Sequence, residues 1–152
     1  MDKIIISDTS CLIALSKIGM LNILKDLYQE IIVTREVHDE FGSKLPEWII
    51  VFEVKNKQKQ IEIEKRLDKG EASSIALALE IENTILIIDE IKGRKIAQSF
   101  DIEIIGTIGV LLVANEKGLI KDIISVILTL VNRGFRISDK LIEQLIYKFG
   151  KH

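Results

Sequence analysis

The stretch Lys3-Ile4-Ile5-Ile6-Ser7-Asp8-Thr9-Ser10 near the start of the chain decides the fold that we expect. Its three isoleucines stand on successive rather than alternate positions, a pattern typical of a strand that helices cover on both faces. In an open parallel sheet, ligands bind outside the carboxyl ends of the strands, where Asp8 would stand. Asp8, Thr9 or Ser10 is equally suited to cap a helix that begins near Cys11. This stretch alone therefore leaves catalysis and helix capping open.

Composition limits the class of protein. The chain has 152 residues, of which 47% are hydrophobic and 29% charged, so we expect a single soluble domain over residues 1–152. The N-terminus lacks the basic and then apolar layout of a signal peptide. Lysine, aspartate and hydroxyl residues interrupt the most apolar segment, Leu119 to Val131, so no membrane span is expected. We therefore expect a cytoplasmic protein.

Composition also limits the kind of site. Cys11 has no second cysteine to pair with, and its apolar surroundings favour a buried packing role. Two histidines, His38 and His152, do not build a histidine-rich zinc site. A net charge of −2 gives no overall basic field that would indicate nucleic-acid binding. A metal site in this chain would use oxygen ligands, which favours Mg²⁺ or Mn²⁺.

Two glutamates lie on predicted helices close to the buried face. Glu40 is only about 60° around its helix from Val37, at the edge of the apolar stripe, although a solvated helix acid is the ordinary role. Glu71 lies on the same helical face as Ile75, and the helix dipole is the ordinary explanation for an acid in a first turn. The dipole does not explain why Glu71 faces inward.

The strand predicted at residues 85–88 ends in Asp89, as the first strand ends in Asp8. A parallel sheet would bring these two acids and the two helix glutamates to one edge. Four packed carboxylates repel one another unless a divalent cation neutralises them. The pattern therefore favours a cation site over four unrelated surface acids.

Basic and donor groups accompany the acids. Residues 92–95 carry three cations, and Glu90 with Arg94 has the spacing of a favourable i,i+4 ion pair, the ordinary role of this arginine. Beside a metal, Arg94 would instead hold a phosphate. Thr107 can cap a helix whose N-terminus points backbone donors towards the same edge of the sheet. The basic segment over residues 55–69 is expected to be a solvated helix face rather than a phosphate-binding one.

Strands and helices alternate along the chain, which predicts a doubly wound three-layer α/β/α sandwich with right-handed crossovers. Besides the two strands above, we expect strands at residues 30–34, 48–54 and 102–105. Two final helices, 119–131 and 138–149, would pack on this body. The first is apolar around most of its circumference, which predicts a homodimer or partner interface unless the domain itself buries it.

These motifs, in this order, resemble the PIN-domain family of metal-dependent ribonucleases, which includes the VapC-like toxins of toxin-antitoxin pairs, and in particular a mostly uncharacterised PIN-like subfamily. The resemblance covers nearly the whole chain. It is carried by Ile6-Ser7-Asp8-Thr9-Ser10, Val37-x-x-Glu40, Gly70-Glu71-Ala72, Asp89-Glu90 with Arg94 and Ala97, and Gly106-Thr107-x-Gly109-Val110-Leu111-Leu112.

The resemblance implies a central five-stranded parallel sheet of order 3-2-1-4-5. It also implies an Mg²⁺- or Mn²⁺-dependent endoribonuclease in which an activated water cleaves RNA, the toxin of a type II pair with a small antitoxin as partner. The residues assigned to the metal and to catalysis are Asp8, Glu40, Glu71 and Asp89. Those assigned to positioning of substrate or water are Thr9, Ser10, Glu90, Arg94 and Thr107. The chain departs from the commoner pattern in its Gly-Glu-Ala turn and in Ile87-Ile88, which replace the usual threonine before the last aspartate region.

The same residues argue against two other doubly wound families and leave one alternative open. A haloacid-dehalogenase-like phosphatase needs a second aspartate two residues after Asp8, where Ser10 stands. A response-regulator receiver needs an aspartate after the third strand, where Glu53-Val54-Lys55 offers none. A PIN-like module that binds RNA or a protein without cleaving anything stays open, because it would use the same acids and cations.

Overall fold

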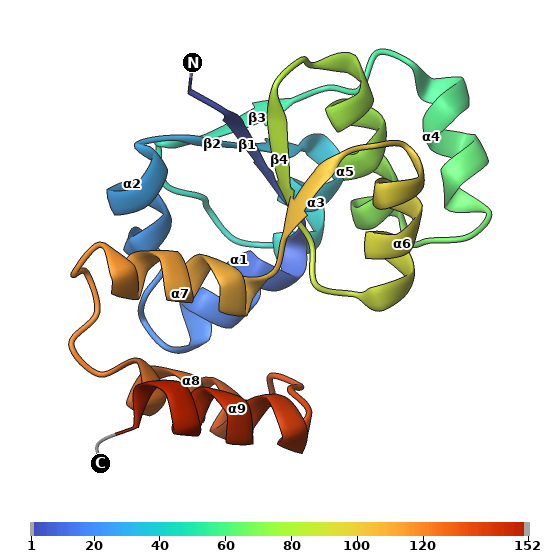
Figure 1. The fold of residues 1–152 in the computed structure, drawn as a ribbon. Helices are drawn as coiled ribbons and strands as arrows, with labels where there is room; N and C mark the ends of the chain where they lie inside the picture. The colour runs from blue at the N-terminus through green and yellow to red at the C-terminus, as the bar shows by residue number, and fades with distance from the viewer. Residues whose placement is uncertain (1, 151–152) are drawn as a thin grey trace.

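The computed structural model describes residues 2–150, in which five strands form one parallel sheet (Figure 1). The strands are β1 (Ile4–Ser7), β2 (Ile31–Thr34), β3 (Ile49–Phe52), β4 (Thr84–Ile87) and β5 (Glu103–Ile105). Their order, β3-β2-β1-β4-β5, is the predicted one. Ser7 of β1 pairs with Ile87 of β4, so the two central strands end side by side. Asp8 and Asp89 follow these ends.

Helices cover both faces of the sheet, which confirms the predicted three layers. The described helices are α1 (Thr9–Lys17), α2 (Asn22–Tyr28), α3 (Arg35–Phe41), α4 (Lys57–Glu64), α5 (Lys69–Glu80), α6 (Ile91–Ser99), α7 (Thr107–Glu116), α8 (Ile123–Asn132) and α9 (Asp139–Phe149). One hydrophobic cluster joins the sheet to α1, α2, α7, α8 and α9, and a second joins it to α4, α5 and α6. Figure 1 shows α4, α5 and α6 together on one side of the strands.

The successive isoleucines of β1 serve both layers. Ile5 belongs to the first cluster and Ile6 to the second, because neighbouring strand residues point to opposite faces. The same alternation places Ile87 in the first cluster and Ile88 in the second. Each fully buried isoleucine contributes roughly 1.5–3 kcal/mol. This burial fixes the two strand ends that carry the aspartates.

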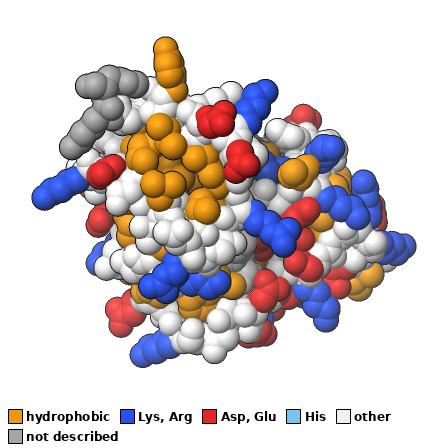
Figure 2. All heavy atoms as spheres, turned by 90° about the horizontal axis from the view of Figure 1, so that it is seen from below, with side chains coloured by type: hydrophobic (Ala, Val, Ile, Leu, Met, Phe, Trp, Pro, Cys, Tyr) orange, Lys and Arg blue, Asp and Glu red, His pale blue; other side chains and the backbone are white. Residues whose placement is uncertain are grey.

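The C-terminal helices pack on the side of α1 and α7. The predicted helix 119–131 begins later, at Ile123, because Asp122 caps it by accepting a hydrogen bond from the Ser125 N–H. Ile127 and Leu130 are buried within the domain, so burial accounts for one face of α8. Other apolar side chains of α8 and α9 stay exposed, and Figure 2 shows hydrophobic side chains gathered on this lower face of the molecule.

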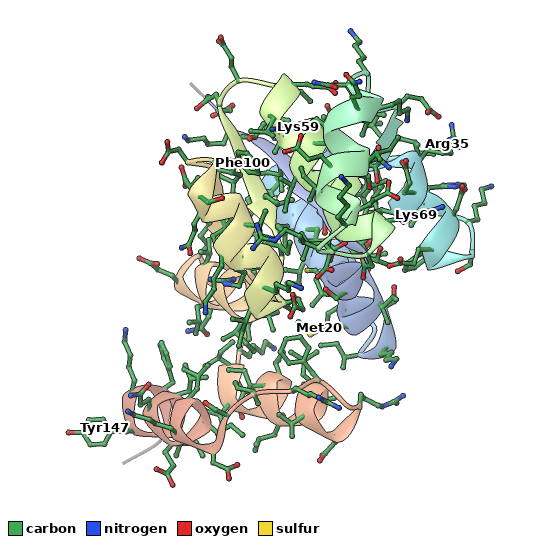
Figure 3. All side chains as sticks on the ribbon, turned by 90° about the vertical axis from the view of Figure 1, so that its right-hand side faces the viewer. Met20, Arg35, Lys59, Lys69, Phe100 and Tyr147 are labelled. Carbon is green, nitrogen blue, oxygen red and sulfur yellow. The ribbon has the colours of Figure 1, made fainter. Side chains whose placement is uncertain are left out.

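The basic segment before α5 forms α4 and acts as a solvated face, as predicted. Lys57 and Lys59 make ion pairs with nearby glutamates at the surface, although Glu36 and Lys59 are themselves half-buried. Figure 3 shows Lys59 beside Phe100, where its ammonium nitrogen stands 4.9 Å from the ring centre. Among the described residues, no helix is long and apolar enough to cross a membrane.

Candidate active site

Asp8 stands at the N-cap position of α1, yet its carboxylate makes no capping hydrogen bond. The residue is 5% exposed, and its Oδ1 is buried without a hydrogen-bond partner among the described residues. Burial raises the pKa of Asp8 to about 7; the charges of Glu71, Asp68 and Glu40 add to the shift, and the Thr9 backbone opposes it. A buried polar atom without a partner is costly. Capping therefore does not explain this aspartate.

Three side-chain oxygens from α1, its cap and α3 converge on Gly70, the second residue of α5. A methyl group placed on Gly70 would lie 3.2 Å from each of Asp8 Oδ1, Thr9 Oγ1 and Glu40 Oε1. Thr9 Oγ1, like Asp8 Oδ1, is buried and without a partner in the described structure, whereas Glu40 is exposed. Because Gly70 has no side chain, α5 can approach these oxygens closely without covering them.

Glu71 takes part in the cap of α5 through one carboxylate oxygen, and its other oxygen lies outside that cap. Its backbone N–H donates to Asp68 Oδ1 (2.8 Å), and the Asp68 N–H donates to Glu71 Oε1 (3.4 Å), which forms a capping box. Oε2 points towards α6 and lies 3.4 Å from a methyl group placed on Gly93. Burial, followed by the charge of Asp68, raises the pKa of Glu71 to about 7.

The sequence analysis assigned no role in the site to Asp68. It caps α5 and its charge acts on both Asp8 and Glu71. The signal was present, because Asp68-x-x-Glu71 has the spacing of an N-terminal capping box. That pattern indicates a helix start and says nothing about a shared site.

Asp89 is held by the first residue of α7. The Thr107 N–H donates to Asp89 Oδ1 (2.7 Å), and the Thr107 hydroxyl donates to Asp89 Oδ2 (2.6 Å). The sequence suggested Thr107 as the cap of this helix, but Gly106 stands at the N-cap position and offers no side chain. The carboxylate of Asp89 serves the helix start instead, and each of its oxygens keeps a lone pair for a further ligand.

Glu90 and Arg94 do not form the expected ion pair in the described structure. Glu90 caps α6 by accepting a hydrogen bond from the Gly93 N–H (2.9 Å). Arg94 Nη1 donates to the Ile88 carbonyl oxygen (2.9 Å). A methyl group on Gly106 would lie 3.0 Å from both Arg94 Nη1 and Asp89 Oδ1. The Ile88 carbonyl oxygen therefore holds Arg94 beside Asp89, while Glu90 serves as the cap of α6.

Two residues near Asp8 have other surroundings. Ser10 is exposed and lines a pocket between α1 and the segment after α8, away from the oxygens at Gly70. Cys11 is buried, and burial raises the pKa of its thiol to about 12. A thiol that keeps its proton is a poor nucleophile, which confirms the packing role predicted for Cys11.

The donor set can be compared with the needs of a cation. Within residues 2–150, no group of three His, Cys, Asp or Glu side chains is placed so that it could hold a metal ion. The oxygens at Gly70 nevertheless suit a hard divalent cation, because they belong to two carboxylates and a hydroxyl. Mg²⁺ is commonly bound through one or two carboxylates and keeps several waters. The residues present therefore fit Mg²⁺ or Mn²⁺.

The comparison with protein families agrees with this geometry. Residues 4–151 match a family model described as a PIN domain. No curated protein and no solved structure matches the chain significantly. PIN domains are typically nucleases and generally use divalent metals, which suits acids gathered at the carboxyl ends of central strands. Because the match covers nearly the whole length, the chain belongs to the PIN-domain family.

Proposed function

We propose that this protein is an Mg²⁺- or Mn²⁺-dependent endoribonuclease whose site is centred on Asp8. The observation that carries the proposal is the convergence of Asp8, Thr9 and Glu40 on the bare backbone of Gly70. Two of these oxygens are buried and unpartnered in the described structure, a state that a cation would relieve. Family membership supplies the reaction class.

Each residue has a distinct task in this proposal. When bound, a divalent cation supplies positive charge at the phosphate and lowers the pKa of a nearby water. Asp8 and Glu40 would hold the cation, and Asp8 must lose its proton to do so. Thr107 fixes the orientation of Asp89 through two hydrogen bonds. Arg94, beside Asp89, presents a guanidinium that can pair with a phosphate.

The test is cleavage of a total-RNA pool by the purified protein with Mg²⁺ and then Mn²⁺, beside a chelator control. Asp8→Asn is the test variant, and Asp26→Asn, at an exposed position on α2, is the matched control. We expect metal-dependent cutting that Asp8→Asn abolishes and Asp26→Asn retains. Equal cutting by Asp8→Asn would show that the site assignment is wrong.

One observation favours a second candidate, a PIN-like module that binds RNA or protein without cleaving it. Of the four carboxylates assigned to the metal, only Asp8 and Glu40 are among the oxygens that converge on Gly70, which weakens the case for a complete catalytic metal site. Metal-loaded, folded protein that binds RNA but cuts none in the pool would favour this candidate over the nuclease.

The toxin role rests on the family alone. We propose that a small antitoxin covers the acids, because a basic side chain complements their charge. Production of the chain in a bacterial host should then arrest growth, and Asp8→Asn should not. Undisturbed growth with a nuclease-active chain would contradict the toxin role.

A homodimer is also a proposal. Leu128 of α8 and Ile146 of α9 are 42% and 45% exposed. Figure 2 shows hydrophobic side chains gathered on the lower face of the molecule, the side on which α8 and α9 lie in Figure 1. Sedimentation velocity measures the assembly directly. A monomer at concentrations where the protein is active would contradict it.

A further inference from the structure

A small pocket lies between α1 and the α8–α9 linker, residues 133–138. Its volume is about 200 Å³. One wall is a single face of α1, since its residues there recur at i, i+3, i+4 and i+7. The other wall is the end of α8 and the start of the linker. The lining residues are Ser10, Ile13, Ala14, Lys17, Leu130, Arg133, Gly134 and Phe135.

The pocket is connected to the candidate active site by two residues. Ser10 forms part of its wall and is only two positions from Asp8. Phe135 lines this pocket and also a larger groove of about 590 Å³ that contains Asp89 and Arg94. Phe135 of the linker therefore stands between the pocket and the groove that contains Asp89 and Arg94. Lys17, seven residues after Ser10, lies about 10 Å farther along α1.

Gly134 shapes the linker at this point. Its φ of +99° is in the region that favours glycine, and it lets the chain turn directly after α8. The turn leaves the side chains of Arg133 and Phe135 on the same pocket. Phe135 also packs against the hydrophobic cluster that contains α1 and α8, so its ring is held in place.

The rim of the pocket is positively charged. Lys17 and Arg133 are exposed and take part in no ion pair within the described structure. Each stands at the C-terminal end of a helix, where the dipole favours a cation. The dipoles do not explain why both cations face one apolar pocket. An anion with an apolar part complements this arrangement.

We propose that this pocket holds a nucleotide neighbouring the scissile phosphate of a single-stranded RNA, with its base against Phe135 and its phosphate near Lys17 and Arg133. The proposal rests on the ribonuclease function proposed above. Pockets for drug-sized ligands have volumes of roughly 300–1,000 Å³, so this pocket suits a base-sized group better than a cofactor. Stacking on an aromatic ring and pairing with cations are the usual means of binding unpaired RNA.

The test is binding of an end-labelled single-stranded oligoribonucleotide, followed by fluorescence anisotropy in chelator, where no metal-dependent cutting occurs. Phe135→Leu keeps an apolar side chain in the core but removes the stacking ring, so we expect affinity to fall about 5- to 100-fold. Lys17→Gln and Arg133→Gln should each reduce the salt slope of binding by about 0.7. Lys25→Gln, at an exposed position on α2, is the charge-matched control and should change neither quantity.

The outcomes separate this proposal from the function on which it rests. If the wild type cuts RNA and all three variants bind like the wild type, the subsite is refuted while the nuclease stands, and a protein partner becomes the better occupant. If the wild type neither binds nor cuts RNA, both proposals fall. Thermal denaturation checks the fold of each variant. If Phe135→Leu is unfolded, the salt slopes of the two cation variants decide.

Discussion

Asp8→Asn is expected to stabilise the metal-free protein at pH 8. The pKa of Asp8 is raised from an ordinary 3.8 to about 7, so the folded state binds this proton more tightly than the unfolded state. A shift of this size corresponds to about 4 kcal/mol of cost for keeping the carboxylate charged in the folded protein. The cost is absent below pH 3.8, grows as the pH rises, and is complete above pH 7.

Asparagine keeps the shape of aspartate and never carries the charge. We expect Asp8→Asn to raise the free energy of unfolding by about 2–4 kcal/mol at pH 8, and by little at pH 4. The assay is urea unfolding of both proteins in chelator at pH 4, 6 and 8. Asp26→Asn is the control, and an exposed substitution of this kind should stay within about 0.5 kcal/mol of the wild type.

Added Mg²⁺ should make the wild type more stable than Asp8→Asn, the reverse of the order in chelator. A cation that binds only the folded state stabilises it by mass action, so the wild type should gain stability with Mg²⁺ and Asp8→Asn should not. A variant that is no more stable than the wild type at pH 8 in chelator would refute the reasoning. It would mean that the Asp8 carboxylate is solvated or hydrogen-bonded in the folded protein.

Three further changes test neighbouring parts of the site. Gly70→Ala places a methyl group 3.2 Å from the three converging oxygens, so the stabilisation by Mg²⁺ in a thermal melt should be smaller than in the wild type, although alanine favours the helix. Unchanged stabilisation would contradict a cation site at Gly70. Thr107→Val removes the 2.6 Å hydrogen bond to Asp89 and should cost about 1–3 kcal/mol in urea unfolding and lower kcat for RNA cleavage; a neutral result would make that bond unimportant. Glu71→Gln removes a carboxyl whose pKa is raised to about 7, so the variant should gain stability relative to the wild type as the pH rises from 4 to 8. A difference in the free energy of unfolding that stays constant over this range would contradict the raised pKa.

The layers of the fold follow from the chain itself. Successive apolar residues such as Ile5 and Ile6 need cover on opposite faces, and the structure supplies it with one cluster on each side. Ile4, at the start of β1, is 37% exposed. The strand order came from the family resemblance rather than from the residues. Periodicity places a residue on a face of its own element, but it does not say which strand pairs with which.

The site was predictable only in part for the same reason. The helical angle between Val37 and Glu40 anticipated an acid at the edge of the core, and Glu40 does reach the oxygens at Gly70. The hydrogen bonds from Thr107 to Asp89 join residues 18 positions apart, and no local pattern indicates such a cap. The ion pair that the spacing of Glu90 and Arg94 suggested does not form in the described structure, where Glu90 caps α6 and Arg94 donates to the Ile88 carbonyl oxygen.

No sequence pattern predicted a role in the site for the linker after α8. Arg133 and Phe135 belong to no motif that the sequence offered, and they come near Ser10 only through the packing of α8 on α1. Contacts between segments more than 100 residues apart depend on the whole fold.

The most direct test of the central claim is a titration of the protein with Mn²⁺, with free Mn²⁺ measured by electron paramagnetic resonance. It asks whether the oxygens of Asp8, Thr9 and Glu40 around Gly70 form a cation site, without reference to any RNA. The account predicts saturable Mn²⁺ binding that competes with Mg²⁺, survives in Asp26→Asn and is at least 10-fold weaker in Asp8→Asn. Equal binding by the wild type and Asp8→Asn, or no binding by folded wild-type protein, would contradict it.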